Sequence, residues 1–122
     1  MDNRSGVLGE KYAEKYLRKR KYKILDRNFR SKYGEIDIIA CDLQYIIFVE
    51  VKTREENSLV SGQEAVHYQK QQKIIKTAMC YLQLHPTNLQ PRFDVAVIST
   101  KQGQKLIHSI EWITDAFQGS GY

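Results

Sequence analysis

Hydrophobic positions recur along the chain with two different spacings, which predict two helices and five strands. Apolar residues recur at helical spacing from 5 to 21 and again from 64 to 84, where Pro86 follows the second run. Short apolar runs rich in β-branched residues predict strands at 22–31, 34–40, 46–52, 93–99 and 105–113. The polar stretch 53–62 is expected to be a loop, and 114–122 a short helical turn with a frayed end.

The order of these segments predicts an α/β fold. A helix is followed by three strands, a second helix and two more strands, and the first three strands are close enough in sequence to form a meander. The second helix is long enough for a right-handed crossover that returns the fourth strand parallel to the third. We therefore expect a mixed central sheet of about five strands flanked by helices. A chain of 122 residues is expected to form a single domain, 1–122.

The two most apolar strands carry charges where a buried strand normally has none. Asp37 lies inside the first of these runs and Glu35 stands just before it, whereas Glu50 and Lys52 lie at the end of the second run. Ionised groups within a core strand are costly unless they are paired or bound to a metal. An ion-paired strand in an ordinary core and a functional site are the two interpretations.

A tight turn just after Asp42 would join these strands as a hairpin. That turn places Asp37 opposite Glu50 and Glu35 opposite Lys52, with directly opposed Cβ atoms about 5 Å apart. Two carboxylates at that separation repel each other. At least one of them should therefore titrate above its usual pKa in the metal-free protein.

The same pair of carboxylates suits a divalent cation. Hard oxygen ligands with no histidine or thiolate nearby favour Mg²⁺ or Mn²⁺ over zinc. Lys52 follows one pleat after Glu50, where it can place a positive charge beside a metal-bound water or a phosphate. The hairpin therefore predicts a magnesium or manganese site.

Two further acids are candidates for the same site. Glu10 flanks the apolar stripe of the first helix, where it is either a surface residue or a group that reaches towards Asp37. Asp94 begins a buried strand, where it either supports the metal ligands or serves as a structural hydrogen-bonding group.

Composition narrows the class of protein. The net charge of +5 and the isoelectric point of about 9.2 suit a polyanionic partner, although many proteins without one are equally basic. Cys41 and Cys80 are spaced for neither a zinc site nor a disulfide framework, which favours a reducing compartment. The first residues lack an apolar signal region, and no apolar run is long enough to span a membrane. We therefore expect a cytoplasmic protein with no membrane partner.

These residues, taken in order, resemble the PD-(D/E)XK nuclease superfamily. Archaeal Holliday junction resolvases are similar in architecture, and the YraN-like family of small endonucleases is the more specific resemblance. It covers most of the chain. The matching segments are Gly9-Glu10 with Ala13 and Tyr16-Leu17, Asn28, Gly34 to Ala40, Phe48 to Arg54, Ala65-Val66 with Lys70, and Arg92 to Val95.

The resemblance implies a restriction-endonuclease-like αβββαβ core and a set of site residues. Asp37 and Glu50 correspond to the metal-binding acids of the family, with Glu10 and the main-chain carbonyl of Val51 as further candidate ligands. Lys52 corresponds to its catalytic lysine. Glu35 and Asp94 would support the site from behind.

The expected function is hydrolysis of phosphodiester bonds in DNA by a metal-dependent nuclease, with a branched or otherwise structured substrate. The alternative is a non-catalytic nucleic-acid-binding or protein-interaction module on the same scaffold. Such modules usually lose an acid or the lysine, and all are retained here, which favours the enzyme. The sequence leaves open whether the protein forms a homodimer. The predicted phosphate contacts, some of which could instead form an ordinary solvated helix face, are Arg18, Arg20, Lys21, Lys23, Arg27, Arg30, Lys70 and Lys73.

Overall fold

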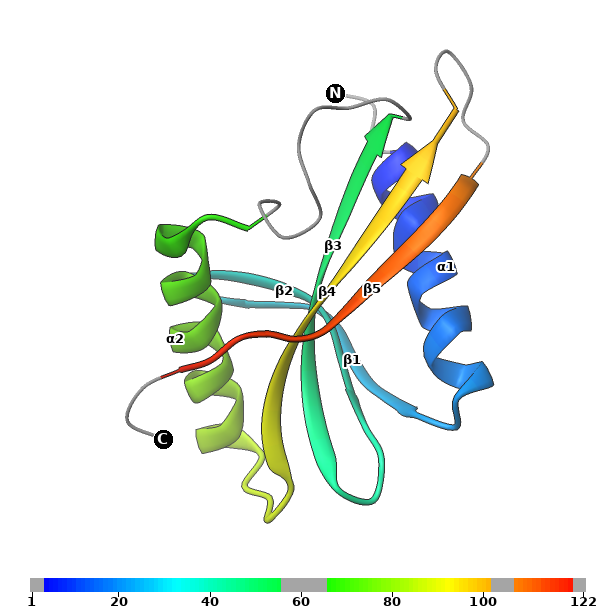
Figure 1. Ribbon diagram of the computed structural model, residues 1–122. Coiled ribbons are helices and arrows are strands. Elements are labelled where there is room, and N and C mark those ends of the chain that lie inside the picture. The colour runs from blue at the N-terminus through cyan, green and yellow to red at the C-terminus, as the bar shows by residue number, and fades with distance from the viewer. Residues whose placement is uncertain (1–3, 56–65, 102–106, 120–122) are drawn as a thin grey trace.

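Two helices and a five-stranded sheet make up the part of the chain that the computed structural model describes, residues 4–55, 66–101 and 107–119 (Figure 1). Helix α1 spans Arg4–Lys19 and α2 spans Tyr68–Leu84. The strands are β1 (Lys23–Ser31), β2 (Gly34–Cys41), β3 (Tyr45–Glu55), β4 (Gln90–Thr100) and β5 (Ile107–Phe117). None of the described helices is both long and apolar enough to cross a membrane.

The sheet has the order β1-β2-β3-β4-β5. Strands β3 and β4 are parallel, and the other neighbouring pairs are antiparallel. Helix α2 forms the crossover between the two parallel strands, on the face of the sheet opposite α1 (Figure 1). The predicted mixed α/β sheet, and the restriction-endonuclease-like order of its elements, are confirmed.

Strand β3 is buried on both faces, which explains its unbroken apolar run. Ile46 and Phe48 pack in the cluster beneath α2, whereas Ile47 and Val49 pack in the cluster beneath α1. All four are at most 2% exposed. A strand covered on both faces by helices needs apolar residues at every position rather than at every second one.

Helix α1 approaches β3 closely at one glycine. Gly9 is buried, and a Cβ atom at this position would lie 2.9 Å from Oγ1 of Thr53 and 3.4 Å from Ile98. The missing side chain lets the first half of the helix lie directly on the strand. Its neighbour Glu10 is thereby brought close enough to β3 for an electrostatic interaction with Glu50.

Helix α2 begins later than its apolar pattern predicted. The helix starts at Tyr68, with His67 in an extended conformation at its N-cap. Val66 belongs to the predicted helix but is buried in non-helical backbone, where it joins the core beneath α2. Because Val66 fits the helical spacing of the apolar residues, the sequence predicted an extra turn of helix that the structure does not have. The remaining predicted residues, 64 and 65, lie outside the described part of the chain.

The ends of β3 and β5 also differ from the expectation. Parallel pairing with β4 carries β3 on to Glu55, so 53–55 are strand rather than loop, and 56–62 lie outside the described residues. The helical turn predicted after 113 is wrong for 114–117, because β5 continues to Phe117. Phe117 is buried and stacks on Phe93, with ring centroids 5.1 Å apart. Residues 105, 106 and 120–122 lie outside the described part.

The close approach at Gly9 predicts the effect of adding one methyl group. In an exposed helix, alanine in place of glycine would stabilise by roughly 1 kcal/mol. Here we expect Gly9→Ala to destabilise the protein by about 1–3 kcal/mol, because the new methyl group overlaps Thr53. The free energy of unfolding in urea measures the effect. A second change, Thr53→Ala, should recover part of the loss, and a stabilising Gly9→Ala would contradict the packing described here.

Candidate active site

The two central strands separate at the predicted acids. The register of the β2–β3 hairpin is the expected one from Cys41–Ile46 to Ile38–Val49, where the pairing ends. The next step, which would have placed Asp37 opposite Glu50, is not a ladder pair. Figure 1 shows the first half of β2 and the second half of β3 leading away from each other.

Asp37 lies in the fork between these strands. Its Oδ2 atom accepts a hydrogen bond of 2.7 Å from the backbone N–H of Val51. The carboxylate thus takes the place of a main-chain acceptor. The direct opposition of Asp37 with Glu50 and of Glu35 with Lys52 is therefore corrected: the acids gather around a gap in the sheet instead of facing each other across a ladder.

A kink in the β1–β2 hairpin produces the fork. Asn28 falls opposite Asp37 in the hairpin register and has a φ of 52°, a left-handed conformation that asparagine tolerates better than most residues. Ile36 packs beneath α2 and Ile38 beneath α1, although residues two apart share a face in a regular strand. The strand therefore turns over at Asp37.

Glu50 is held from the opposite helix. Its carboxylate is 5% exposed, and its Oε1 atom lies 2.7 Å from Nζ of Lys70 in the first turn of α2. Lys52 lies two residues beyond Glu50 on β3 and is partly buried. Lys70 was predicted to contact phosphates, but in this structure its ammonium group is engaged with Glu50.

Glu10 and Glu35 meet at the kink. With the Asn28 carboxamide in the orientation that satisfies both acids, its nitrogen donates to Glu10 at 3.2 Å and to Glu35 at 2.9 Å. Glu35 also lies 3.5 Å from Nε of Arg30. Helix α1 thus places Glu10 on the same side of the fork as Glu35. This agrees with the interpretation in which Glu10 reaches towards the site rather than the one in which it is a surface residue.

The neighbouring carboxylates disturb the titration of Asp37 and Glu10. Burial, followed by the negative charge of Glu50, raises the pKa of Asp37 to about 7. Burial and the charge of Glu35 raise the pKa of Glu10. Burial, followed by the charge of Lys70, lowers the pKa of Lys52. The expectation that one of the central pair titrates above its usual value is confirmed for Asp37.

The donor set fits a hard divalent cation. Among the described residues no three aspartate, glutamate, histidine or cysteine side chains already surround a single point. Mg²⁺ does not require such a cage, because it binds through one or two carboxylates and fills its other positions with water and substrate phosphate. Asp37 and Glu50, with the carbonyl of Val51 between the two strands, could supply those ligands.

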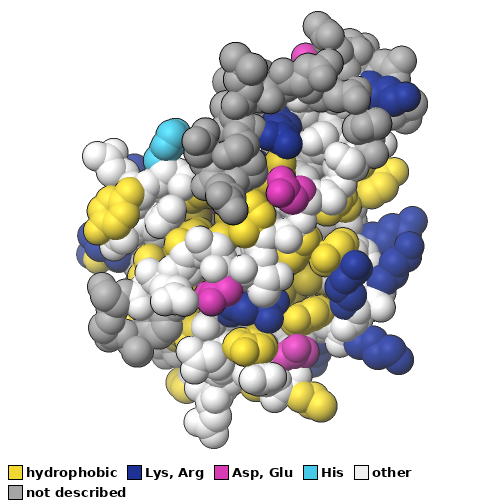
Figure 2. Space-filling view, viewed as in Figure 1, with side chains coloured by type: hydrophobic (Ala, Val, Ile, Leu, Met, Phe, Trp, Pro, Cys, Tyr) yellow, Lys and Arg dark blue, Asp and Glu magenta, His cyan; other side chains and the backbone are white. Residues whose placement is uncertain are grey.

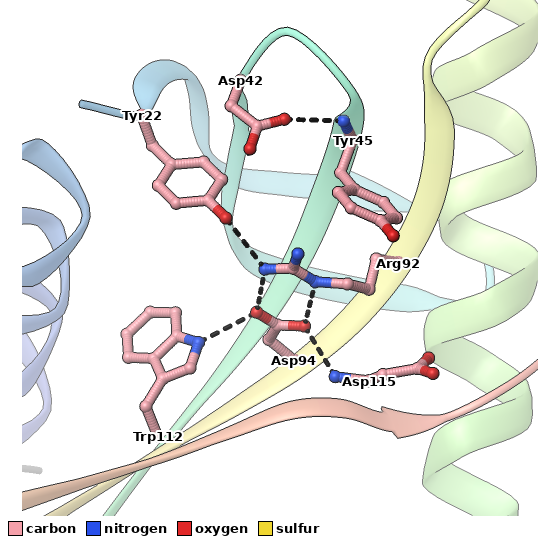
Figure 3. Close-up of polar contacts among 7 residues, drawn as sticks. All are labelled: Tyr22, Asp42, Tyr45, Arg92, Asp94, Trp112 and Asp115. Carbon is pink, nitrogen blue, oxygen red and sulfur yellow. Dashed lines mark hydrogen bonds and ion pairs between the residues drawn. The ribbon is translucent and has the colours of Figure 1, made fainter. Parts of the chain in front are cut away.

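Asp94 belongs to a different part of the molecule (Figure 3). It is fully buried and accepts four hydrogen bonds, two from Arg92 and one each from Trp112 Nε1 and the N–H of Asp115, at 2.8–3.0 Å. Arg92 also donates to Tyr22 at 3.2 Å. None of these partners is among the predicted site residues. Of the two interpretations of Asp94, the structure shows the structural hydrogen-bonding group.

Several predicted phosphate contacts already have acidic or aromatic partners. Glu14 accepts from Arg27 at 2.7 Å and lies 3.5 Å from Arg18. The guanidinium of Arg20 stacks 3.5 Å above the ring of Tyr16. Together with the Arg30–Glu35 and Lys70–Glu50 pairs, these contacts leave three exposed lysines from the predicted set, which are Lys21, Lys23 and Lys73.

Two exposed cations of α1, Lys11 and Lys15, lie outside the set predicted from the sequence. Lys11, Lys15 and Lys19 recur every four residues on the solvent side of α1, and the first of them adjoins Glu10. Lys and Arg side chains gather on the side of the molecule where α1 lies (Figure 2). The four-residue spacing of these lysines is present in the sequence, on the face of the helix opposite its apolar stripe, and could have indicated them.

The comparison with known proteins places the chain in a family. A model described as "Uncharacterised protein family UPF0102" matches residues 9–98. The chain belongs to this family. UPF0102 is the YraN-like family, so the resemblance stated from the sequence motifs is confirmed.

Members of UPF0102 match this chain over nearly its full length. A UPF0102 protein of Caldanaerobacter subterraneus subsp. tengcongensis is 42% identical over 113 residues, which cover 92% of this chain and 93% of that protein. A UPF0102 protein of Thermodesulfovibrio yellowstonii is 42% identical over 112 residues, which cover 92% of this chain and 94% of that protein. A UPF0102 protein of Syntrophus aciditrophicus is 44% identical over 117 residues, which cover 94% of this chain and 89% of that protein.

The raised pKa of Asp37 predicts a pH-dependent cost in stability. A carboxyl group whose folded pKa is about 7 does not destabilise the fold below roughly pH 4, and destabilises it increasingly as the pH rises through 7. We expect Asp37→Asn to stabilise the metal-free protein by about 1–3 kcal/mol at pH 8 and to have little effect at pH 4. Urea unfolding at both pH values, with a chelator present, measures the difference.

Asp42 offers a matched control at the other end of the same hairpin. Burial opposes its ionisation, but hydrogen bonds from the N–H groups of Tyr45 and Gln44 outweigh burial and lower its pKa. Asp42→Asn should therefore lose stability at pH 8 relative to pH 4, opposite in sign to Asp37→Asn. A destabilised Asp37→Asn at pH 8 would show that its carboxylate is a structural group.

Proposed function

We propose that this protein is a divalent-metal-dependent nuclease that hydrolyses phosphodiester bonds in DNA, with branched or otherwise structured DNA as its substrate. The observation that carries the proposal is the meeting of Asp37, Glu50 and Lys52 at the fork between β2 and β3. Helix α1 adds Glu10 to this group. Perturbed carboxylates beside a partly buried lysine are typical of catalytic sites.

Each residue of the fork would have a distinct role. Asp37, Glu50 and the carbonyl of Val51 would hold Mg²⁺ or Mn²⁺, which when bound activates water and neutralises charge on the phosphate. Lys52 has a lowered pKa, which makes its neutral amine more accessible, so its Nζ atom could accept a proton from the attacking water. In its charged form it would instead neutralise charge on the phosphate oxygens. Glu10 would position water through its carboxylate.

The exposed lysines of α1 supply a surface for the DNA backbone. Lys11 and Lys15 lie on the same helix as Glu10, within about two turns of the fork. Lysines contact phosphates without reading bases. This arrangement supports recognition of DNA by shape, which a branched substrate allows.

A second candidate function follows from the Lys70–Glu50 contact. A short ion pair between a buried carboxylate and a lysine is also what a purely structural site would contain. A non-catalytic nucleic-acid-binding module would retain this pair with no need for a metal. The raised pKa of Asp37 favours the enzyme, because a structural site gains nothing from an acid that is difficult to ionise.

A cleavage screen separates these functions. Linear, flapped, splayed and four-way DNA and structured RNA would each be incubated with Mg²⁺ or Mn²⁺. We expect cleavage of a branched DNA, and a loss of about a hundredfold or more in Asp37→Ala, Glu50→Ala and Lys52→Ala. DNA binding without metal should remain within several-fold, because these residues face the metal rather than the duplex. Asp42→Asn is the matched control and should cleave normally. Wild-type cleavage by Glu50→Ala would refute the site assignment.

The salt dependence of DNA binding tests the proposed surface. Each phosphate contact adds about 0.9 to the slope of log affinity against log salt. Replacing Lys11 and Lys15 by glutamine should therefore reduce the slope by nearly two. Lys32 and Lys76 are a matched pair near Tyr33, on the α2 side, and their replacement should leave the slope unchanged. Equal slopes for the wild type and the α1 variant would exclude this face.

A further inference from the structure

Within the described part of the chain, Lys70 forms a salt bridge with one of the proposed metal ligands. Its Nζ atom lies 2.7 Å from Oε1 of Glu50, whose side chain is 5% exposed, while the lysine side chain itself is 44% exposed. The contact joins the first turn of α2 to the middle of β3, elements that are distant in the sequence. One end of this lysine therefore lies inside the site while its stem remains on the surface.

The contact occupies an oxygen that a metal ion would need. An ammonium group at hydrogen-bond distance satisfies the carboxylate and places a positive charge beside it, which opposes the approach of a second cation. Asp37 is held in a similar way by the N–H of Val51. Each of the two central carboxylates thus has a partner from the chain itself.

A buried carboxylate needs such a partner when no metal is present. Removing one member of a buried ion pair leaves an unpaired charge and is strongly destabilising. The amine of Lys70 provides that compensation, and its flexible stem lets it move to solvent without a change in the backbone. The pair is therefore suited to be broken and remade.

We propose that Lys70 is a positioning residue of the active site: its ammonium group holds Glu50 in the metal-free protein and leaves that carboxylate when a divalent cation binds. The inference rests on the proposed function, because it requires Glu50 to be a metal ligand. When a group must first be displaced, the apparent Kd for the metal equals the intrinsic Kd divided by the fraction of molecules in which Glu50 is free. Once displaced, the ammonium is free to face an anionic substrate.

Four variants and one probe metal test this role. Mn²⁺ would be titrated calorimetrically into the wild type, Lys70→Met, Lys70→Gln, Lys70→Arg and Lys73→Met, and melting temperatures would be measured with and without Mn²⁺. Lys73 is the control, because it is an exposed lysine one turn later on α2 with no salt bridge to a described residue. Lys70→Gln removes the charge but can still donate a hydrogen bond, which guards against a variant that fails to fold.

We expect Lys70→Met and Lys70→Gln to bind Mn²⁺ about three- to tenfold more tightly than the wild type, because the competing cation is gone. Without Mn²⁺ both should melt at a lower temperature, and Mn²⁺ should stabilise them more than it stabilises the wild type. Lys70→Arg keeps the ion pair and should bind Mn²⁺ like the wild type, as should Lys73→Met. A purely structural lysine would change the melting temperature but not the metal affinity.

Two results would overturn the inference, and they differ in what else they exclude. If the wild type binds Mn²⁺ and cleaves DNA while Lys70→Met and Lys70→Gln bind Mn²⁺ no more tightly, the displacement role is wrong and the nuclease remains. If the wild type shows neither calorimetric binding nor a shift in melting temperature with Mn²⁺, the proposed metal site fails and the inference fails with it.

Discussion

Burial of β3 on both faces is the constraint on which the rest of the structure depends. From Ile46 to Val49 its apolar residues alternate between the clusters under α1 and α2, and parallel pairing with β4 runs along the whole strand. Because β3 is the central strand and packs against both helices, Glu50 at its middle and Lys52 beyond it are positioned relative to both. A site built on such a strand is held more firmly than one built on loops.

The fully buried Asp94 and the partly buried Asp37 show opposite outcomes of removing an aspartate from water. Asp94 accepts four hydrogen bonds, two of them from a guanidinium, so its charge is well compensated. Asp37 receives one bond from the Val51 N–H and faces other acids, and its pKa is raised to about 7. The hydrogen bonds of Asp94 stabilise the pairing of β4 with β5, because Asp94 lies on β4 and its partners Trp112 and Asp115 lie on β5. The arrangement around Asp37 stores unfavourable energy, which a protein tolerates most readily where a cation or substrate will relieve it.

The fork between β2 and β3 shows how a small irregularity in a sheet creates room for chemistry. A ladder continued through Asp37 would have closed the gap with main-chain hydrogen bonds. The left-handed Asn28 instead turns the strand over, and its carboxamide then bridges Glu10 and Glu35. Irregular positions of this kind often re-aim side chains next to active sites. Gly9 completes the arrangement, because only a residue without a side chain lets α1 approach near enough to add its glutamate.

Local patterns in the sequence determined the order of elements, the parallel crossover and the register of the central hairpin. They sufficed because strand and helix periods and short turns are properties of neighbouring residues. The same patterns placed the start of α2 and the end of β5 wrongly, since burial of Val66 and Phe117 depends on partners elsewhere. The two-residue turn at Lys32-Tyr33 already places Asn28 opposite Asp37, so this position of Asn28 could have been anticipated from the sequence. The pairing of Lys70 with Glu50 could not, because it joins segments whose distance is set by how α2 packs on the sheet, and no spacing along the chain records that distance.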